Sequence, residues 1–135
     1  MWVRKNMNET KSYFAHSKFW SLAALVSLFV LVIATILAYF RLIPIEIKNI
    51  PYYDSIGHFF LFGILAFSLD RALNKRMMNV ARLSLPLGAA LIASYAVTDE
   101  SLQFFSSVRS FDLGDLSFSL LGVVICTLLS RLAMK

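Results

Sequence analysis

The chain has 135 residues, of which 59% are hydrophobic and 16% are charged. This composition excludes an ordinary soluble domain, in which roughly a quarter of the residues are charged. The net charge of +5 does not indicate nucleic-acid binding, because the basic residues flank apolar segments and form no single patch interleaved with aromatic residues. Cys126 is the only cysteine, which excludes an internal disulfide and a four-cysteine metal site.

The first apolar segment, Phe19 to Phe40, has no charged residue over its 22 positions. A helix of that length reaches roughly 33 Å, enough to cross the hydrocarbon core of a bilayer. A cleaved signal peptide is the alternative, since basic residues precede the segment, but the segment exceeds the usual apolar region of about 7–15 residues. We therefore predict an uncleaved transmembrane helix, preceded by a cytoplasmic N-terminal segment over residues 1–18.

Three further apolar stretches follow, at Ile56 to Leu69, Leu83 to Val97 and Leu116 to Ser130. Each has about 15 residues, which is short of the roughly 20 that a spanning helix needs. Each stretch can span a membrane only if its helix includes polar residues at one end. The polar residues beside these stretches are therefore expected at helix ends, and not in a free loop.

The predicted helix limits follow from proline and capping residues. The second helix is expected to begin near Pro51, because proline suits a first helical turn. The third is expected to begin around Ser84 and Pro86 and to end near Gln103. The fourth is expected to be capped by Ser110 or Asp112.

The distribution of charge predicts the orientation. Most of the 13 lysine and arginine residues lie in the N-terminal segment, the second connection and the C-terminus, whereas the other two connections contain only Arg41, Lys48 and Arg109. By the positive-inside rule both termini are cytoplasmic. The opposite, extracytoplasmic face then holds most of the acidic residues: Glu46, Asp54, Asp99, Glu100, Asp112 and Asp115.

We accordingly predict an all-α protein, a multi-pass protein of the cytoplasmic membrane whose residues 19–135 form one domain. Short connections favour antiparallel neighbours, and hence an antiparallel bundle of four transmembrane helices. The basic residues of the second connection are interpreted as anchors to anionic membrane lipids. They are Arg71, Lys75, Arg76 and Arg82.

Asp54 and His58 are four residues apart, so they share one face of a helix. A carboxylate beside an imidazole can fix its tautomer and raise its basicity, as a general base or a metal ligand requires. The structural alternative is an aspartate that stabilises the start of the helix and a histidine that is hydrogen-bonded to a neighbouring helix.

Asp99, Glu100 and Gln103 lie toward the C-terminal end of the predicted third helix, where the helix dipole disfavours anions. A positive group should compensate them, and Arg109 is the only lysine or arginine in the following connection. Ionisable groups drawn into a membrane segment usually face the bundle interior or a cavity, which makes Asp112 and Asp115 site candidates as well.

A bound cation is an alternative to this network, because five of these side chains offer hard oxygen ligands or an imidazole. They are His58, Asp99, Glu100, Asp112 and Asp115. No spacing of the H-E-x-x-H kind is present, and we assign no metal ligands from the sequence.

The pattern D-x-x-x-H-F at Asp54 to Phe59, followed by D-E-x-x-Q-x-F-x-x-x-R-x-x-D-x-x-D at Asp99 to Asp115, resembles the signature of the VanZ-like family over roughly residues 20 to 133. The chain departs from the family pattern at Ser55, where a lysine is common, and at Ser119, where an asparagine is common. The resemblance implies a small integral membrane protein with polar motifs at its helix ends. It also suggests a link to teicoplanin-type glycopeptide resistance, with which the namesake is associated.

We expect these polar side chains to converge on one extracytoplasmic cleft that binds an envelope lipid headgroup or a cell-wall precursor. Arg109 would bind an anionic group, and His58 would exchange protons near neutral pH. His58, Glu100 and Asp99 are the candidate catalytic residues. The candidate ligand contacts are Asp54, Gln103, Arg109, Asp112 and Asp115.

The sequence identifies no cofactor and is compatible with a homo-oligomer. Two other interpretations stay open. In one, the polar cluster is a structural clasp in a scaffold or partner subunit. In the other, the Asp, Glu and His residues belong to a membrane-embedded hydrolase or transferase.

Overall fold

The structure is a computed structural model that describes residues 2–133, with side chains described for residues 17–133 except Ile45 and Lys48. Four long helices, one short helix and one small β-hairpin make up this part of the chain. In order they are α1 (Trp2–Tyr39), α2 (Ile45–Lys48), α3 (Tyr53–Ala72), β1 (Met77–Val80), β2 (Leu83–Pro86), α4 (Leu87–Gln103) and α5 (Leu113–Leu132).

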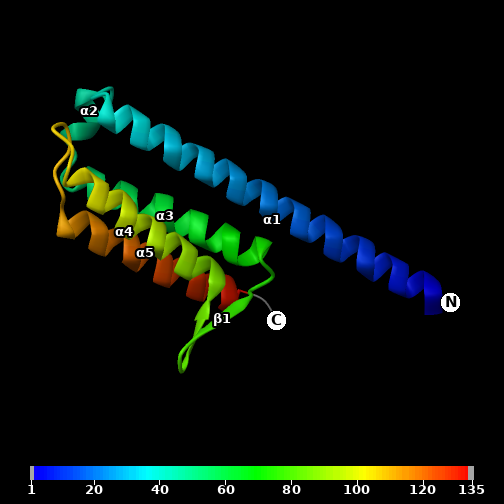
Figure 1. Cartoon of the computed structure of the whole chain (residues 1–135). Coiled ribbons are helices and arrows are strands. Elements are labelled where there is room, and N and C mark those ends of the chain that lie inside the picture. The colour runs from blue at the N-terminus through cyan, green and yellow to red at the C-terminus, as the bar shows by residue number, and fades with distance from the viewer. Residues whose placement is uncertain (1, 134–135) are drawn as a thin grey trace.

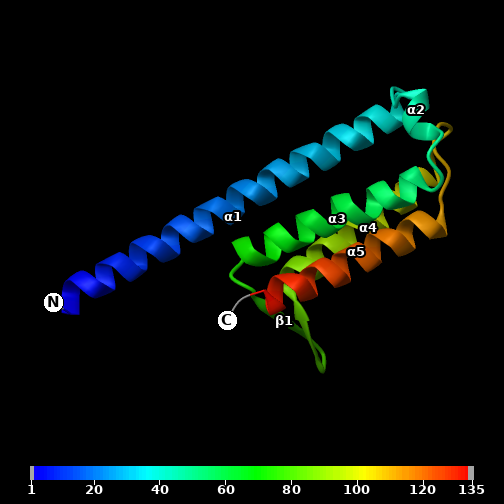
Figure 2. The same cartoon turned by 180° about the vertical axis from the view of Figure 1, so that it is seen from behind.

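The helices α3, α4 and α5 form a bundle. The C-terminal half of α1 lies along α3, whereas its N-terminal half extends away from the bundle (Figures 1 and 2). Successive long helices run in opposite directions. One end of the bundle therefore carries the connections at residues 40–52 and 104–112, and the other end carries the hairpin and the end of α5 (Figure 1). We call these the loop end and the hairpin end. The predicted antiparallel arrangement is thus confirmed.

Three helices are long and apolar enough to cross a membrane: Ser17–Tyr39 within α1, Tyr53–Ala72 and Leu113–Leu132. The helix α4 has 17 residues and reaches only about 26 Å. The prediction of four spans is therefore supported by length and composition for three of the four long helices.

The third helix begins one residue after Pro86, which is its N-cap, so the part of the prediction that placed its start at Ser84 is wrong. Residues 83–86 form β2, which pairs antiparallel with β1 in the register Met77 to Pro86. The residue before a proline favours extended backbone, and Pro86 itself is extended with ψ of 122°, so α4 begins only at Leu87. The apolar stretch Leu83 to Val97 therefore comprises the strand β2 and the first part of the helix α4.

Of the other helix starts, that of α1 differs from expectation, whereas those of α3 and α5 agree with it. α1 begins at Trp2, so the helix extends through the segment that was assigned to residues 1–18. α3 begins at Tyr53, after Tyr52 in a left-handed conformation with φ of 57°. α5 is capped by Asp112, one of the two predicted residues, whose Oδ1 accepts from the Gly114 amide at 2.7 Å.

Two glycines let the backbones of α3 and α5 approach closely. A Cβ atom added to Gly122 would overlap the carbonyl oxygen of Phe59, and one added to Gly63 would lie 2.7 Å from Cys126 Sγ. Small residues serve this purpose in membrane bundles, where close packing replaces the hydrophobic effect. This contact sets α3 against α5 and aligns their polar residues at the loop end.

The hairpin end is held by a separate polar cluster around Asp70, a fully buried residue of α3. Its carboxylate accepts from Arg131 Nη2 at 2.7 Å and from Ser130 Oγ at 2.8 Å, both on α5. Arg131 Nη2 also donates to the Lys75 carbonyl at 3.1 Å. Asp70 therefore ties α3 to α5 and to the start of the hairpin connection.

Arg71 is buried and does not face solvent as an exposed lipid anchor would. Its guanidinium lies 5.2 Å from the ring centroid of Trp20 on α1 and 5.3 Å from that of Phe67. These distances fit cation–π contacts, so Arg71 joins α1 to α3. Arg76 and Arg82, by contrast, are exposed as expected.

Candidate functional site

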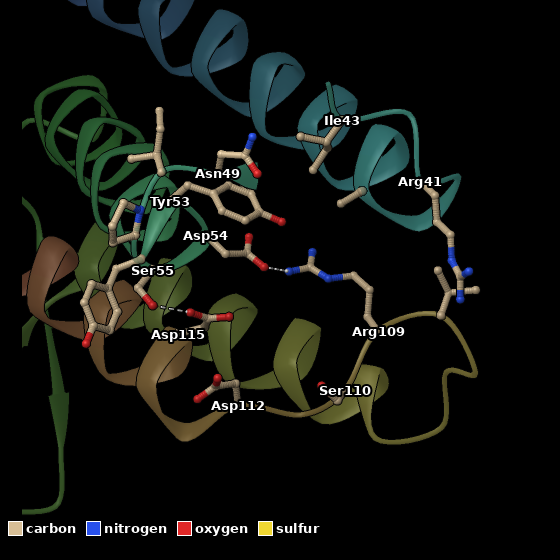
Figure 3. Close-up of a pocket in the computed structure, with 15 residues that line it drawn as sticks. Arg41, Ile43, Asn49, Tyr53, Asp54, Ser55, Arg109, Ser110, Asp112 and Asp115 are labelled. Atoms are coloured by element: carbon tan, nitrogen blue, oxygen red, sulfur yellow. Dashed lines mark hydrogen bonds and ion pairs between the residues drawn. The ribbon is translucent and has the colours of Figure 1, made fainter. Parts of the chain in front are cut away.

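A cavity of about 770 Å³ opens at the loop end, between the end of α1, the start of α3 and the connection at residues 104–112 (Figure 3). We call it the loop-end pocket. Its wall is largely polar and charged, and among its lining residues are Arg41, Asn49, Tyr52, Tyr53, Asp54, Ser55, Arg109, Ser110, Asp112 and Asp115. A volume of this size lies within the usual range for ligand pockets, about 300–1,000 Å³.

Arg109 reaches from the 104–112 connection into this pocket and meets Asp54 on the first turn of α3 (Figure 3). Its Nη2 lies 2.8 Å from Asp54 Oδ2, and the side chain is 12% exposed. Within the described part of the chain, Nε and Nη1 of Arg109 make no hydrogen bond. The guanidinium is therefore positioned by Asp54 and keeps donors for another acceptor.

His58, one turn after Asp54, is buried with 7% exposure. Its Nδ1 lies 3.0 Å from Ser119 Oγ on α5, and its Nε2 lies 3.8 Å from Asp54 Oδ1. Asp115, also 7% exposed, accepts from Ser55 Oγ at 2.5 Å. Two serines thus position the imidazole and a buried carboxylate between α3 and α5.

Glu100 and Gln103 lie at the end of α4 and are each 1% exposed. Glu100 Oε1 accepts from the Asp112 backbone N–H at 2.7 Å, and Oε2 accepts from Gln103 Nε2 at 3.2 Å. Glu100 also lies within electrostatic range of His58, Asp115 and Arg109. It connects the end of α4 to the start of α5.

The remaining candidates are less enclosed. Asp99 is half-buried, accepts from Gln103 Nε2 at 3.4 Å, and lines a smaller cavity of about 200 Å³ with Asp54 and His58. Asp112 is exposed and caps α5. All eight predicted site residues therefore lie at the loop end, but Asp112 serves the helix start and Glu100 the connection between helices.

The family comparison agrees with the polar motifs. The family model described as VanZ/LLP1 matches residues 3–134, nearly the whole chain. The chain belongs to the VanZ/LLP1 family. Neither a curated protein nor a solved structure matches it.

The VanZ/LLP1 chain uses the two positions at which it departs from the expected family pattern. Ser55 binds Asp115, and Ser119 binds His58, so both serines are part of the polar network. The sequence alone identifies both positions only as departures from the family pattern. A signal was available for Ser119, because it follows Asp115 by four residues and therefore shares its helical face.

Sequence reasoning also missed the wall of the pocket formed by residues before α3 and by its first residue. Arg41, Asn49, Tyr52 and Tyr53 line it, and all but Tyr53 are exposed. Tyr52 and Arg41 both have positive φ values, 57° and 58°, which turn the chain back over the bundle. A turn made by residues other than glycine gives little signal in a single sequence.

Proposed function

We propose that this VanZ/LLP1 membrane protein uses the loop-end pocket to bind the phosphate-bearing headgroup of an envelope lipid or a lipid-linked cell-wall precursor. The observation that carries the proposal is the position of Arg109. Its guanidinium lies in the wall of a cavity of about 770 Å³, is fixed by Asp54 at 2.8 Å, and has donors left over. A fixed guanidinium suits bidentate binding of phosphate.

The rest of the wall supports a headgroup that also carries hydroxyl or amide groups. Asn49 and Ser110 offer neutral donors and acceptors, and Arg41 adds a second positive charge. Asp54, Asp112 and Asp115 supply acceptors for hydroxyl groups of a sugar or glycerol. A purely anionic ligand would be repelled by these acids, so a ligand with both phosphate and hydroxyl groups fits the wall best.

The proposed orientation puts the loop-end pocket on the extracytoplasmic face of the cytoplasmic membrane. The hairpin end carries Lys75, Arg76 and Arg82, as the positive-inside rule requires of a cytoplasmic face. The pocket then opens toward the leaflet in which finished cell-wall precursors are displayed. A link to teicoplanin-type resistance belongs to this proposal.

The test is lipid binding by the purified protein. We expect native mass spectrometry to show adducts with phosphatidylglycerol and with a polyprenyl phosphate, and at least a tenfold loss of both in Arg109→Gln. Arg76→Gln removes the same charge from an exposed position at the hairpin end and serves as the matched control. Equal binding by Arg109→Gln and the wild type would overturn the proposal. If the wild type binds only one of the two lipids, that lipid identifies whether the phosphate belongs to a phospholipid or to a polyprenyl carrier.

A structural clasp is the second candidate, because Glu100 links α4 to the start of α5 through the Asp112 amide at 2.7 Å. The two functions predict different behaviour for Glu100→Gln. A folded, inserted variant that loses a cellular phenotype such as teicoplanin tolerance favours a binding or catalytic site. A variant whose abundance falls in the membrane favours the clasp.

A further inference from the structure

The hydrogen bonds around Ser119 assign the tautomer of His58. The Ser119 hydroxyl has one proton, which it donates to the Asp115 carbonyl at 3.0 Å. Its oxygen then accepts from His58 Nδ1–H, also at 3.0 Å. In a neutral imidazole with the proton on Nδ1, Nε2 carries a lone pair. The Nε2 atom lies 3.8 Å from Asp54 Oδ1.

Two carboxylates consequently gather beside the imidazole. One ring nitrogen of His58 and one oxygen each from Asp54 and Asp115 lie within 4.8 Å of one another. Within the described residues, His58 Nε2 has no hydrogen-bond partner, although the side chain is only 9% exposed. Acceptors without a donor between them repel one another, so this arrangement calls for a positive group at its centre.

The neighbouring charges leave room for a cation. Arg109 neutralises Asp54 through the other oxygen, Oδ2, at 2.8 Å. Asp115 is buried, and its described partner is the neutral hydroxyl of Ser55. A buried carboxylate without an opposite charge is costly, and a bound cation would remove that cost.

We propose that Asp54, His58 and Asp115 bind one divalent transition-metal ion, Zn²⁺ or Mn²⁺. One imidazole and two carboxylates suit these ions, whereas Mg²⁺ prefers oxygen ligands alone. A tetrahedral ion with bonds of about 2.1 Å places its ligand atoms roughly 3.4 Å apart. The 3.8 Å between His58 Nε2 and Asp54 Oδ1 needs to shorten by a few tenths of an ångström, and a ligand pair at the limit of 4.8 Å would need to shorten by about 1.4 Å.

The surroundings match those of known metal sites. A ligating histidine usually donates its other N–H to a fixed acceptor, as His58 does to Ser119, and ligating carboxylates are themselves hydrogen-bonded. Ser55 and Arg109 play that part for Asp115 and Asp54. Asp54 and Asp115 also line the loop-end pocket, so an exchangeable ligand can complete the coordination.

The test is metal analysis of the full chain in detergent, stripped with a chelator and then dialysed separately against ZnCl₂, MnCl₂ and MgCl₂. We expect about one Zn²⁺ or Mn²⁺ per chain and no retained Mg²⁺. His58→Gln and Asp115→Asn should each lose the ion. Asp112→Asn removes the same charge three residues from Asp115, keeps a capping side chain and should retain the ion. Circular dichroism and elution volume check the fold of each variant.

A milder variant keeps the test decisive if those two fail to fold. Ser119→Ala leaves all three ligands in place but frees the imidazole, and we expect its metal affinity by calorimetry to fall about 10- to 100-fold. Three results would each overturn the proposal: no bound Zn²⁺ or Mn²⁺ in the wild type, retention of Mg²⁺, or an unchanged metal affinity in Ser119→Ala. Lipid binding is measured on the chelator-stripped protein, so a failed metal site and a failed headgroup site are distinguishable.

Discussion

Arg109 and Asp54, which are 55 residues apart in the sequence, form an ion pair of 2.8 Å that joins the connection after α4 to the first turn of α3. The pair is unequally buried, since the Arg109 side chain is 12% exposed and that of Asp54 is 38% exposed. Partial exposure screens the attraction, so the pair should contribute little to folding. Loss of the ion pair should therefore weaken ligand binding more than it destabilises the fold.

The first prediction follows from that difference. A double-mutant cycle of Asp54→Asn and Arg109→Gln, measured by unfolding in detergent with a chelator present, should give a coupling free energy of about 1 kcal/mol or less. Lipid binding by the same variants should fall much more. A coupling energy well above about 2 kcal/mol, with lipid binding retained, would instead identify a structural clasp.

The second prediction concerns the hairpin end. Asp70 is fully buried and accepts from Arg131 and Ser130. Asp70→Asn removes the carboxylate that pairs with Arg131, whose side chain is 24% exposed and keeps its hydrogen bond to the Lys75 carbonyl. A lost hydrogen bond to a charged group costs about 1.5–3 kcal/mol, so we expect the free energy of unfolding in detergent to fall by about 2 kcal/mol. Glu46→Gln, at an exposed position on α2, should change it by less than about 0.5 kcal/mol. Similar losses in both variants would refute the distinction.

The sequence predicts local relationships in this chain better than long-range ones. The spacing of four residues between Asp54 and His58 predicts a shared helical face, and Asp112 is predicted as a cap from its residue type. The contacts of Asp115 with Ser55 and of His58 with Ser119 join residues 60 and 61 positions apart. They depend on the packing of α3 against α5, which no spacing in a single sequence encodes.

The hairpin was missed for a different physical reason. Residues 83–86 are apolar enough to continue the run into α4, and a short apolar run does not distinguish a strand from a buried helix. Two local features favour the hairpin over a continued helix. Ala81 turns the chain with φ of 54°, and Ser84 donates to the Asn79 side chain at 2.8 Å across the two strands. Pro86 then ends the extended segment.

The third prediction tests the packing of α3 on α5. A methyl group at Gly122 would overlap the Phe59 carbonyl oxygen, and this backbone atom cannot move aside as a flexible side chain can. Gly122→Ala should therefore cost about 1–3 kcal/mol in unfolding free energy. Gly57→Ala is the matched control on α3, because a Cβ there meets no atom within 4 Å. It should be neutral or slightly stabilising, since alanine favours the helix. Equal effects would show that the helices do not meet at Gly122.

The last prediction concerns topology, which depends on α4. Reporters inserted after Lys48 and at Ala81 should report the extracytoplasmic and the cytoplasmic side, respectively, because the basic residues gather at the hairpin end. The side of a reporter after Lys135 then depends on whether α4, with 17 residues and a reach of about 26 Å, crosses the bilayer.

We expect the reporter after Lys135 to be cytoplasmic. α4 packs against both α3 and α5. A shortfall of a few ångströms against a core of about 30 Å can be met by local thinning of the bilayer. The antiparallel order of α3, α4 and α5 places the Asp70–Arg131 pair at one end and the Arg109–Asp54 pair at the other. An extracytoplasmic reporter after Lys135 would require α5 to run in the opposite sense. That result would be incompatible with both pairs, and with a pocket that opens to the outer leaflet.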